Sequence, residues 1–164
     1  MPDESPKNAI PPDPTLRSTS EDKIAKGQYD IFLCYKSEDK RAVKDIGNQL
    51  RDWGITPWLD MWDIPPGRPW QREIEKQIET IPSAAVFVGQ AGIGPWQQLE
   101  IEAFLREFVS RGCPVIPVLL PDAHDKPKLP PFLEGMQWVD FRRSDPNPME
   151  QLLWGITGKR ISIQ

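Results

Sequence analysis

The sequence predicts an α/β fold of the flavodoxin-like type, a three-layer sandwich in which helices cover both faces of a five-stranded parallel sheet. Short apolar segments alternate with segments whose apolar residues recur every three or four positions. This alternation is typical of a parallel sheet, because the crossover between two parallel strands usually carries a helix. The chain of 164 residues, 38% of them hydrophobic, has the size of one ordinary domain.

Five apolar segments have the length of strands and are bounded by turn residues. The segment 84–89 is continuously apolar, as expected for a strand that is buried on both faces. Pro57 suits an edge position for the second strand, because proline has no N–H to donate to a neighbouring strand. The predicted strands are 29–35, 55–59, 84–89, 114–120 and 136–141.

Amphipathic patterns between these segments indicate helices. Val43, Ile46 and Leu50 are spaced three and four residues apart and should share one face of the first helix, which Gly54 ends. The predicted helices are 39–53, 70–81, 96–110 and 148–158, with a loop at 60–69 and a proline-rich stretch at 121–131.

The helix predicted at 96–110 has an apolar face and a charged face. Four apolar residues should face the core, namely Ile101, Phe104, Leu105 and Phe108. Two pairs of opposite charge lie four residues apart, where side chains on a helix are neighbours. These pairs, which should support the helix surface, are Glu102 with Arg106 and Glu107 with Arg111.

The composition changes near residue 28. Residues 1–28 contain five prolines and mixed charges, with few large apolar side chains. A segment of this kind buries too little apolar surface to offset the entropy of ordering. We therefore expect a disordered N-terminal tail over 1–28 and a folded domain over 29–160. The tail has no charged-then-apolar signal pattern, which favours a cytoplasmic protein.

Charge and residue usage exclude several classes of function. The net charge of −4 gives no basic surface for nucleic acid, and the apolar segments are too short to span a membrane. Cys34 and Cys113 fall in or beside predicted buried strands and are expected to be free, buried thiols. With one histidine, His124, the chain has little material for a metal site or a histidine-based triad. Chemistry should therefore use carboxylates, hydroxyls and aromatic rings.

Trp96 and Glu100 are the strongest candidates for such chemistry. They lie four residues apart at the start of a predicted helix and should fall on one face about one turn apart. An indole beside a carboxylate can hold a flat or sugar-like ligand and stabilise positive charge that forms on it. Most other tryptophans are expected to be structural, and we assign this role to Trp53, Trp58, Trp138 and Trp154.

In parallel α/β sheets, ligands bind beyond the carboxyl ends of the strands, where the strand order reverses. The loops after the first three strands, at 36–38, 60–69 and 90–95, are therefore where a site is expected. The glycines near the third loop are spaced G-x-x-G-x-G, which is not the dinucleotide fingerprint. A tight turn is favoured there over a phosphate-binding loop.

Three segments at these loops, YDIFLCYKSED, LDMWDIPPGRPW and GQAGIGPWQQLE, resemble the conserved boxes of the TIR (Toll/interleukin-1 receptor) domain family. The likeness is to bacterial TIR domains in particular and covers roughly residues 28–160. Pro66 and Gly67 match the Pro-Gly pair of the family's second loop. Trp96 and Glu100 match the W-x-x-x-E pattern of its enzymatic members.

The resemblance implies that the chain cleaves NAD+ between nicotinamide and ribose, giving nicotinamide and ADP-ribose or a cyclic ADP-ribose isomer. Glu100 would be the catalytic carboxylate, and Trp96 would shape the pocket. The other residues implied to line the substrate site are Tyr35, Lys36, Ser37, Asp60 and Trp62. NAD+ is the substrate in this scheme, and neither a further cofactor nor a metal is required.

The resemblance also implies partners. TIR domains assemble with one another through the loop after the second strand, here 60–69, and activity in the family depends on that assembly. The N-terminal tail could attach an activating partner or a further domain. Bacterial TIR enzymes commonly act in anti-phage defence or signalling, which the resemblance implies for this chain as well.

Three other functions compete with NAD+ cleavage. A non-enzymatic TIR adaptor that mediates TIR–TIR assembly is the main alternative, although adaptors commonly lack the glutamate found here at Glu100. A nucleoside-processing transferase also places a glutamate at an N-glycosidic bond, but the loop motifs fit the TIR family better. A phospho-receiver needs an acidic pair at the end of the first strand and an aspartate that ends the third. It is excluded, because these strand ends read FLCYKSED and FVGQAG.

Overall fold

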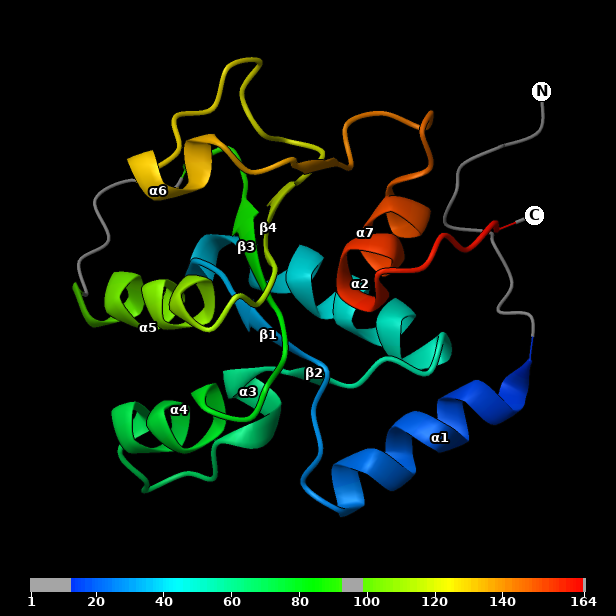
Figure 1. Cartoon of the computed structure of the whole chain (residues 1–164), viewed down its shortest axis with the longest axis vertical. Helices are drawn as coiled ribbons and strands as arrows, with labels where there is room; N and C mark the ends of the chain where they lie inside the picture. The colour runs from blue at the N-terminus through cyan, green and yellow to red at the C-terminus, as the bar shows by residue number, and fades with distance from the viewer. Residues whose placement is uncertain (1–12, 93–98, 164) are drawn as a thin grey trace.

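The computed structural model describes residues 13–92 and 99–163. Its core is a five-stranded sheet with the order β2-β1-β3-β4-β5, in which every neighbouring pair is parallel (Figure 1). The predicted fold class is therefore confirmed. The strands are β1 (Ile31–Cys34), β2 (Pro57–Trp58), β3 (Ala84–Val88), β4 (Val115–Leu119) and β5 (Val139–Asp140).

Helices form a layer on each face of the sheet. In Figure 1, α4 and α5 lie to the left of the strands, and α2 and α7 lie to the right. The longer helices are α1 (Pro14–Ala25), α2 (Lys40–Asp52), α4 (Trp70–Ile78), α5 (Leu99–Ser110) and α7 (Pro148–Thr157). The short helical turns are the 3-10 turn η2 (Ser37–Asp39), α3 (Asp60–Asp63) and α6 (Pro131–Glu134). The turn α3 forms within the predicted loop 60–69, so that prediction is wrong in part, whereas α6 begins at Pro131, where the predicted proline-rich stretch 121–131 ends.

Two apolar layers hold the sheet between its helices, because alternate strand residues point to opposite faces. On one face, Leu33 and Phe87 pack in the cluster that also contains the buried residues of α2 and α7. On the other face, Phe32 stacks on Trp58 with ring centroids 5.3 Å apart and on Phe108 of α5 at 5.9 Å. The buried position of Leu105 and Phe108 agrees with the predicted apolar face of α5.

Pro57 lies in the edge strand β2, which pairs only with β1, as predicted. The predicted pair of Glu102 and Arg106 is also present, with a 3.0 Å contact. The predicted pair of Glu107 and Arg111 is not formed. Arg111 instead donates to the backbone carbonyls of Ile78 and Ile81, because these acceptors at the end of α4 lie within reach of its guanidinium.

The four tryptophans that are predicted to be structural differ in how deeply they are buried. Trp58 is buried and Trp53 packs partly buried against the core. Trp138 and Trp154 are 44% and 39% exposed, so the structural role predicted for them is not one of core packing. Trp154 lies under the guanidinium of Arg160, 4.4 Å from the ring centroid, in a hollow beside α7 rather than in the core.

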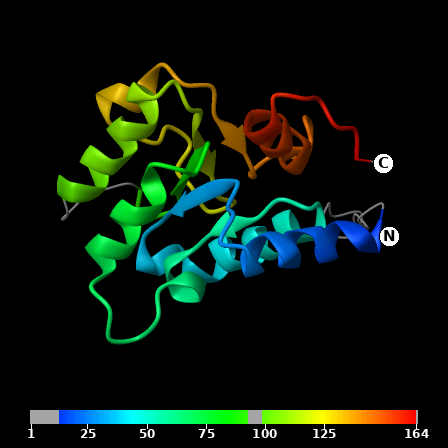
Figure 2. The same ribbon diagram turned by 60° about the horizontal axis from the view of Figure 1, so that its bottom comes forward.

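The predicted disorder of 1–28 is wrong for the part of that segment that the structure describes. Pro14–Ala25 form α1, which runs alongside α2 (Figure 2). The helix begins with a capping contact, since the Thr15 N–H donates to the Asp13 carboxylate at 2.9 Å, and Pro14 occupies the first helical position. Residues 1–12 lie outside the described residues.

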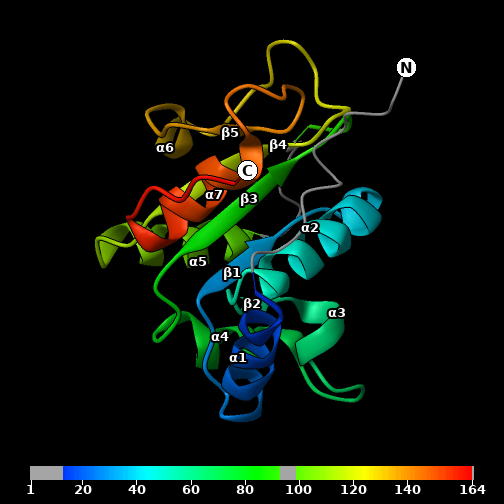
Figure 3. The ribbon, with the colours of Figure 1, turned by 90° about the vertical axis from the view of Figure 1, so that its right-hand side faces the viewer.

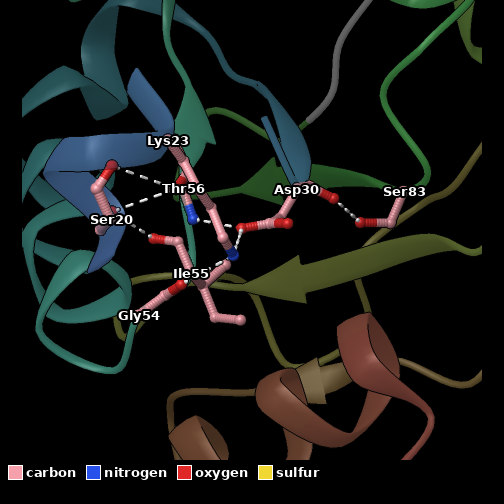
Figure 4. A network of polar contacts seen from close by, with 7 residues as sticks. All are labelled: Ser20, Lys23, Asp30, Gly54, Ile55, Thr56 and Ser83. Atoms are coloured by element: carbon pink, nitrogen blue, oxygen red, sulfur yellow. Dashed lines mark hydrogen bonds and ion pairs between the residues drawn. The ribbon is translucent and has the colours of Figure 1, made fainter. Parts of the chain in front are cut away.

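Polar contacts attach α1 to the domain (Figure 4), and the Leu16 side chain also lies close to Gly54. Ser20 is fully buried, and its hydroxyl lies 3.2 Å from the Thr56 hydroxyl. Lys23 donates to Asp30 at 3.0 Å, and the same Asp30 oxygen accepts from the Thr56 N–H at 2.7 Å. The Ser83 hydroxyl donates to the Asp30 carbonyl at 2.7 Å. The helix is thus joined to the residues that precede β1, β2 and β3, and Figure 3 shows it beside β2.

Cys34 is buried and Cys113 is partly exposed, and both are free thiols. The expectation of free thiols is confirmed, whereas full burial holds for Cys34 alone. Across residues 13–92 and 99–163, no helix has the length and hydropathy needed to cross a bilayer.

Candidate functional site

The strand order reverses between β1 and β3. The chain leaves β1 toward β2 on one side, whereas β3, β4 and β5 follow on the other. In such sheets the connections on the two sides of the reversal run over opposite faces, and a crevice opens at the carboxyl ends of the strands. The segments that lie at this end are 35–39 after β1, 59–69 after β2 and 89–92 after β3.

Tyr35 and Asp60, two of the predicted substrate-binding residues, are brought together at this end. The Tyr35 hydroxyl donates to Oδ1 of Asp60 over 2.6 Å, which ties the end of β1 to the first residue of α3. Burial and the hydrogen bond to the Asp60 carboxylate raise the pKa of the Tyr35 hydroxyl, so it remains a protonated donor near neutral pH.

Lys36 connects the end of β1 to the loop after β3. Its Nζ donates to the carbonyl of Ala91 at 3.3 Å, in an exposed contact. Ser37 lies on the same turn, and its hydroxyl is 3.3 Å from the Glu38 carboxylate. Two of the three expected site loops therefore meet through Lys36, and a cation lies between them.

Asp39 is a residue of this region that the sequence analysis did not single out. It is only 5% exposed, and its carboxylate lies against Gly89, the first residue after β3. Burial is the main cause that raises the pKa of Asp39, and the negative charges of Asp122 and Glu38 raise it further. A glycine at the end of a buried strand is a sign of close approach by another group, but the sequence does not say which group approaches.

Trp62 packs against α2. Its ring lies beneath the guanidinium of Arg51, with 3.9 Å between the Arg51 Cζ and the ring centroid. A Cβ on Gly47 would stand 3.1 Å from the edge of the same ring. These contacts give Trp62 a packing role in the first turn of the loop. Its predicted contact with substrate stays a prediction.

Asp63 fixes the same turn from the other side. One carboxylate oxygen accepts from the Leu59 N–H at 2.7 Å, and the other accepts from the Tyr29 hydroxyl at 3.0 Å. Burial raises the pKa of Asp63 and, with the Asp63 charge, raises that of Tyr29 to about 12. The base of the loop at 60–69 is thereby held to β1 and β2, whereas residues 65–69 are exposed and Gly67 has a φ of +87°.

Glu100 is the second residue of α5. Its backbone thus lies at the start of the described part of the helix that follows β3, whereas its side chain lies outside the described part of the chain. Trp96 lies outside it entirely. The thiol of Cys34, the last residue of β1, is unsuited to nucleophilic chemistry, because burial raises its pKa. In the described ranges, no three His, Cys, Asp or Glu side chains are grouped to hold a metal ion.

Comparison with known proteins identifies the family. The model of the TIR domain family matches residues 31–153, and the chain therefore belongs to the TIR domain family. The TIR domain of the Toll-related receptor TRR-2 from Hydra magnipapillata has the same fold, with a TM-score of 0.61 at 22% identity, over 79% of this chain and 98% of that one. The TIR domains of the activated Roq1 resistosome align with a TM-score of 0.48 at 26% identity, over 56% of this chain and 57% of that one.

A relative in sequence is named a probable 2′ cyclic ADP-D-ribose synthase, TcpO, from Methanobrevibacter olleyae. It is 26% identical over 124 residues, which make up 74% of this chain and 32% of the relative. The chain thus spans about a third of the length of this curated relative.

Proposed function

We propose that the chain is an NAD+ glycohydrolase that breaks the bond between nicotinamide and ribose and releases nicotinamide with ADP-ribose or a cyclic ADP-ribose isomer. The observation that carries this proposal is the position of Glu100 in the first turn of α5, directly after the strand that flanks the reversal of strand order. The relative named as a cyclic ADP-ribose synthase supports the same class of reaction.

The chemistry suits a site of this composition. When the glycosidic bond breaks, its electron pair leaves with the nicotinamide nitrogen, so the pyridinium departs neutral and needs no general acid. Positive charge then builds on the ribose, as at an oxocarbenium centre in glycoside hydrolysis. A carboxylate such as that of Glu100 stabilises this charge most strongly where water is excluded. Water then attacks to give ADP-ribose and a proton, or a group of the substrate itself attacks to give the cyclic isomer.

The remaining predicted residues have roles in this scheme. Lys36 lies where a cation can meet the pyrophosphate, and the linked pair of Tyr35 and Asp60 offers oxygen atoms for ribose hydroxyls. Ser37, Trp62 and Trp96 complete the predicted lining. NAD+ cleavage of this kind belongs in a cytoplasmic anti-phage or signalling response, where a lower NAD+ level or a cyclic product is the output.

Self-assembly through the loop 60–69 is part of the proposal. The loop has a base held by Asp63 and an exposed tip at 65–69, which suits a surface that contacts a second copy. Clustering should then raise activity per molecule, and an activating partner or domain attached through the N-terminal segment 1–28 would supply the clustering. Specific activity that stays constant over a hundredfold dilution would argue against this part.

Chromatography of NAD+ after incubation with concentrated protein tests the proposal. Nicotinamide release that disappears in Glu100→Ala supports it, and the co-product separates hydrolysis from cyclisation. Absence of release from the wild type, even after artificial clustering, would favour the alternative, a non-enzymatic adaptor that acts through TIR–TIR assembly.

A further inference from the structure

The contact of Asp39 with Gly89 leaves no room for a side chain at position 89. A Cβ on Gly89 would stand 2.1 Å from Oδ1 of Asp39, 2.8 Å from its Cγ and 3.0 Å from Oδ2. The φ angle of Gly89 is not in the left-handed region, so its backbone conformation is open to alanine. The carboxylate of Asp39, and not the backbone, is what requires glycine here.

Asp39 is buried at a cost to stability. Asp39 is only 5% exposed, and its Oδ2 has no hydrogen-bond partner within the described part of the chain. An unpaired buried acceptor costs on the order of 1–3 kcal/mol, and more when it is charged. The position of Asp39 therefore calls for an explanation other than stability.

The turn that Asp39 contacts is held from a second side by Lys36. The Lys36 ammonium donates to the Ala91 carbonyl at 3.3 Å, and the turn closes on itself where the Gly92 N–H donates to the Gly89 carbonyl at 2.9 Å. Lys36 and Asp39 both belong to the segment that leaves β1. One segment therefore braces the turn 89–92, which leads toward α5 and Glu100.

We propose that Asp39 is a positioning residue for NAD+ cleavage, whose carboxylate holds the turn 89–92 against the end of β1, where Lys36 also contacts it. This inference rests on the proposed function. The carboxylate of Asp39 fills the space beside Gly89, and its removal leaves the turn 89–92 free to shift. A shift of about 1 Å at a reacting group can cost about a hundredfold in rate.

A double-mutant cycle of Asp39→Ala and Gly89→Ala tests the brace. Gly89→Ala alone should lower both the unfolding midpoint and kcat/KM, because its methyl group meets the carboxylate. In the double variant the methyl group occupies the space that the carboxylate leaves, so both quantities should recover relative to Gly89→Ala alone. Additive losses would overturn the brace, since residues in contact are expected to couple. The controls are Asp45→Ala, exposed on α2, and Gly135→Ala, where a Cβ meets nothing within 4 Å.

The positioning role is tested by Asp39→Ala against Asp39→Asn. Alanine should lower kcat about tenfold or more while the unfolding midpoint stays near that of the wild type, because an unpaired acceptor is removed with the contact. Asparagine keeps the shape and should restore most of kcat. A kcat for Asp39→Ala within about twofold of the wild type, or a failure of asparagine to restore it, would overturn the role.

Hydrogen exchange separates failure of this inference from failure of the proposed function. Amides of 89–92 should exchange faster in Asp39→Ala than in the wild type or Asp45→Ala, whatever the protein catalyses. Unchanged exchange overturns the brace even if NAD+ is cleaved. If exchange is faster in Asp39→Ala but the wild type releases no nicotinamide, the brace stands, whereas the proposed function is overturned and the positioning role with it.

Discussion

The hydroxyl of Tyr35 and the carboxylate of Asp60 are joined by a 2.6 Å hydrogen bond across the carboxyl ends of β1 and β2. This bond links the first box of the TIR pattern to the first residue of the second. It holds two groups with oxygen atoms at a fixed separation beside the reversal of strand order. Together with the contact from Lys36 to Ala91, it joins all three loops that the sequence singles out.

Tyr35→Phe should weaken substrate turnover without unfolding the domain. The hydrogen bond is exposed, so its loss should cost about 0.5–1.5 kcal/mol of stability or less. If Tyr35 and Asp60 contact substrate, kcat/KM should fall about fivefold to tenfold, since each 1.4 kcal/mol corresponds to a factor of ten. Thermal unfolding and steady-state kinetics on the same sample measure the two effects. Unchanged kcat/KM would remove Tyr35 from the site.

Asp63→Ala should loosen the base of the loop 60–69. It removes two acceptors, one for the Leu59 N–H and one for the Tyr29 hydroxyl, and should lower the free energy of unfolding by about 2 kcal/mol. Tyr29→Phe removes only the second contact and should cost about 1 kcal/mol. Urea unfolding of both variants and of their combination measures the coupling. Full additivity would show that the Tyr29–Asp63 bond contributes nothing to stability.

Ser20→Ala should destabilise the domain although the residue lies in a segment that the sequence predicts to be disordered. Its hydroxyl is fully buried and bonds the Ile55 carbonyl at 3.2 Å, so its removal leaves an unpaired acceptor that costs about 1–2 kcal/mol. Ser18→Ala is the matched control, because Ser18 is exposed on the same helix. Equal unfolding midpoints for the two variants would show that α1 is not docked.

The pair of Asp140 and Arg142 should make stability depend on acid pH. Arg142 bonds both carboxylate oxygens of Asp140, at 2.9 and 3.1 Å, and lowers the pKa of Asp140 from its model-peptide value of 3.8. A lowered pKa means that the folded state binds the proton less tightly than the unfolded state. The stabilisation is therefore present above pH 3.8 and is lost as the pH falls through the folded pKa.

Asp140→Asn tests this dependence. The variant should be less stable than the wild type by about 2 kcal/mol near neutral pH, and the difference should shrink as the pH falls below about 4. Urea unfolding at several pH values gives the comparison. A difference that is the same at acid and neutral pH would contradict the assigned charge contact.

The sheet and its covering helices are predictable because their signal is apolar periodicity. Val43, Ile46 and Leu50 share one face in the sequence pattern and are buried together in the structure. Helix α1 is not predictable from apolar periodicity, because the polar side chains of Arg17, Ser20 and Lys23 attach it to the domain. Asp13 followed by Pro14 is a helix-start signal, whereas the other prolines before residue 13 indicate a disordered segment.

The candidate site is predictable in its parts and less so in its contacts. Tyr35, Lys36 and Asp60 follow from the ends of the strands and from the TIR pattern. The brace of Asp39 against Gly89 does not, because its two residues are distant in the sequence and the contact depends on how η2 meets the end of β3. The packing of the Trp62 ring on α2 beneath Arg51 does not follow from the sequence either, since the resemblance implies only a contact with substrate, which stays a prediction.

The rate of nicotinamide release from NAD+ by Glu100→Gln, compared with the wild type and with Glu107→Gln at high protein concentration, tests the central claim most directly. Glu107 is an exposed glutamate on the same helix and controls for the change of charge. We expect the wild type and Glu107→Gln to release nicotinamide, and Glu100→Gln to release it about a hundredfold or more slowly. Equal release by all three proteins, or none by the wild type when it is clustered, would contradict the central claim.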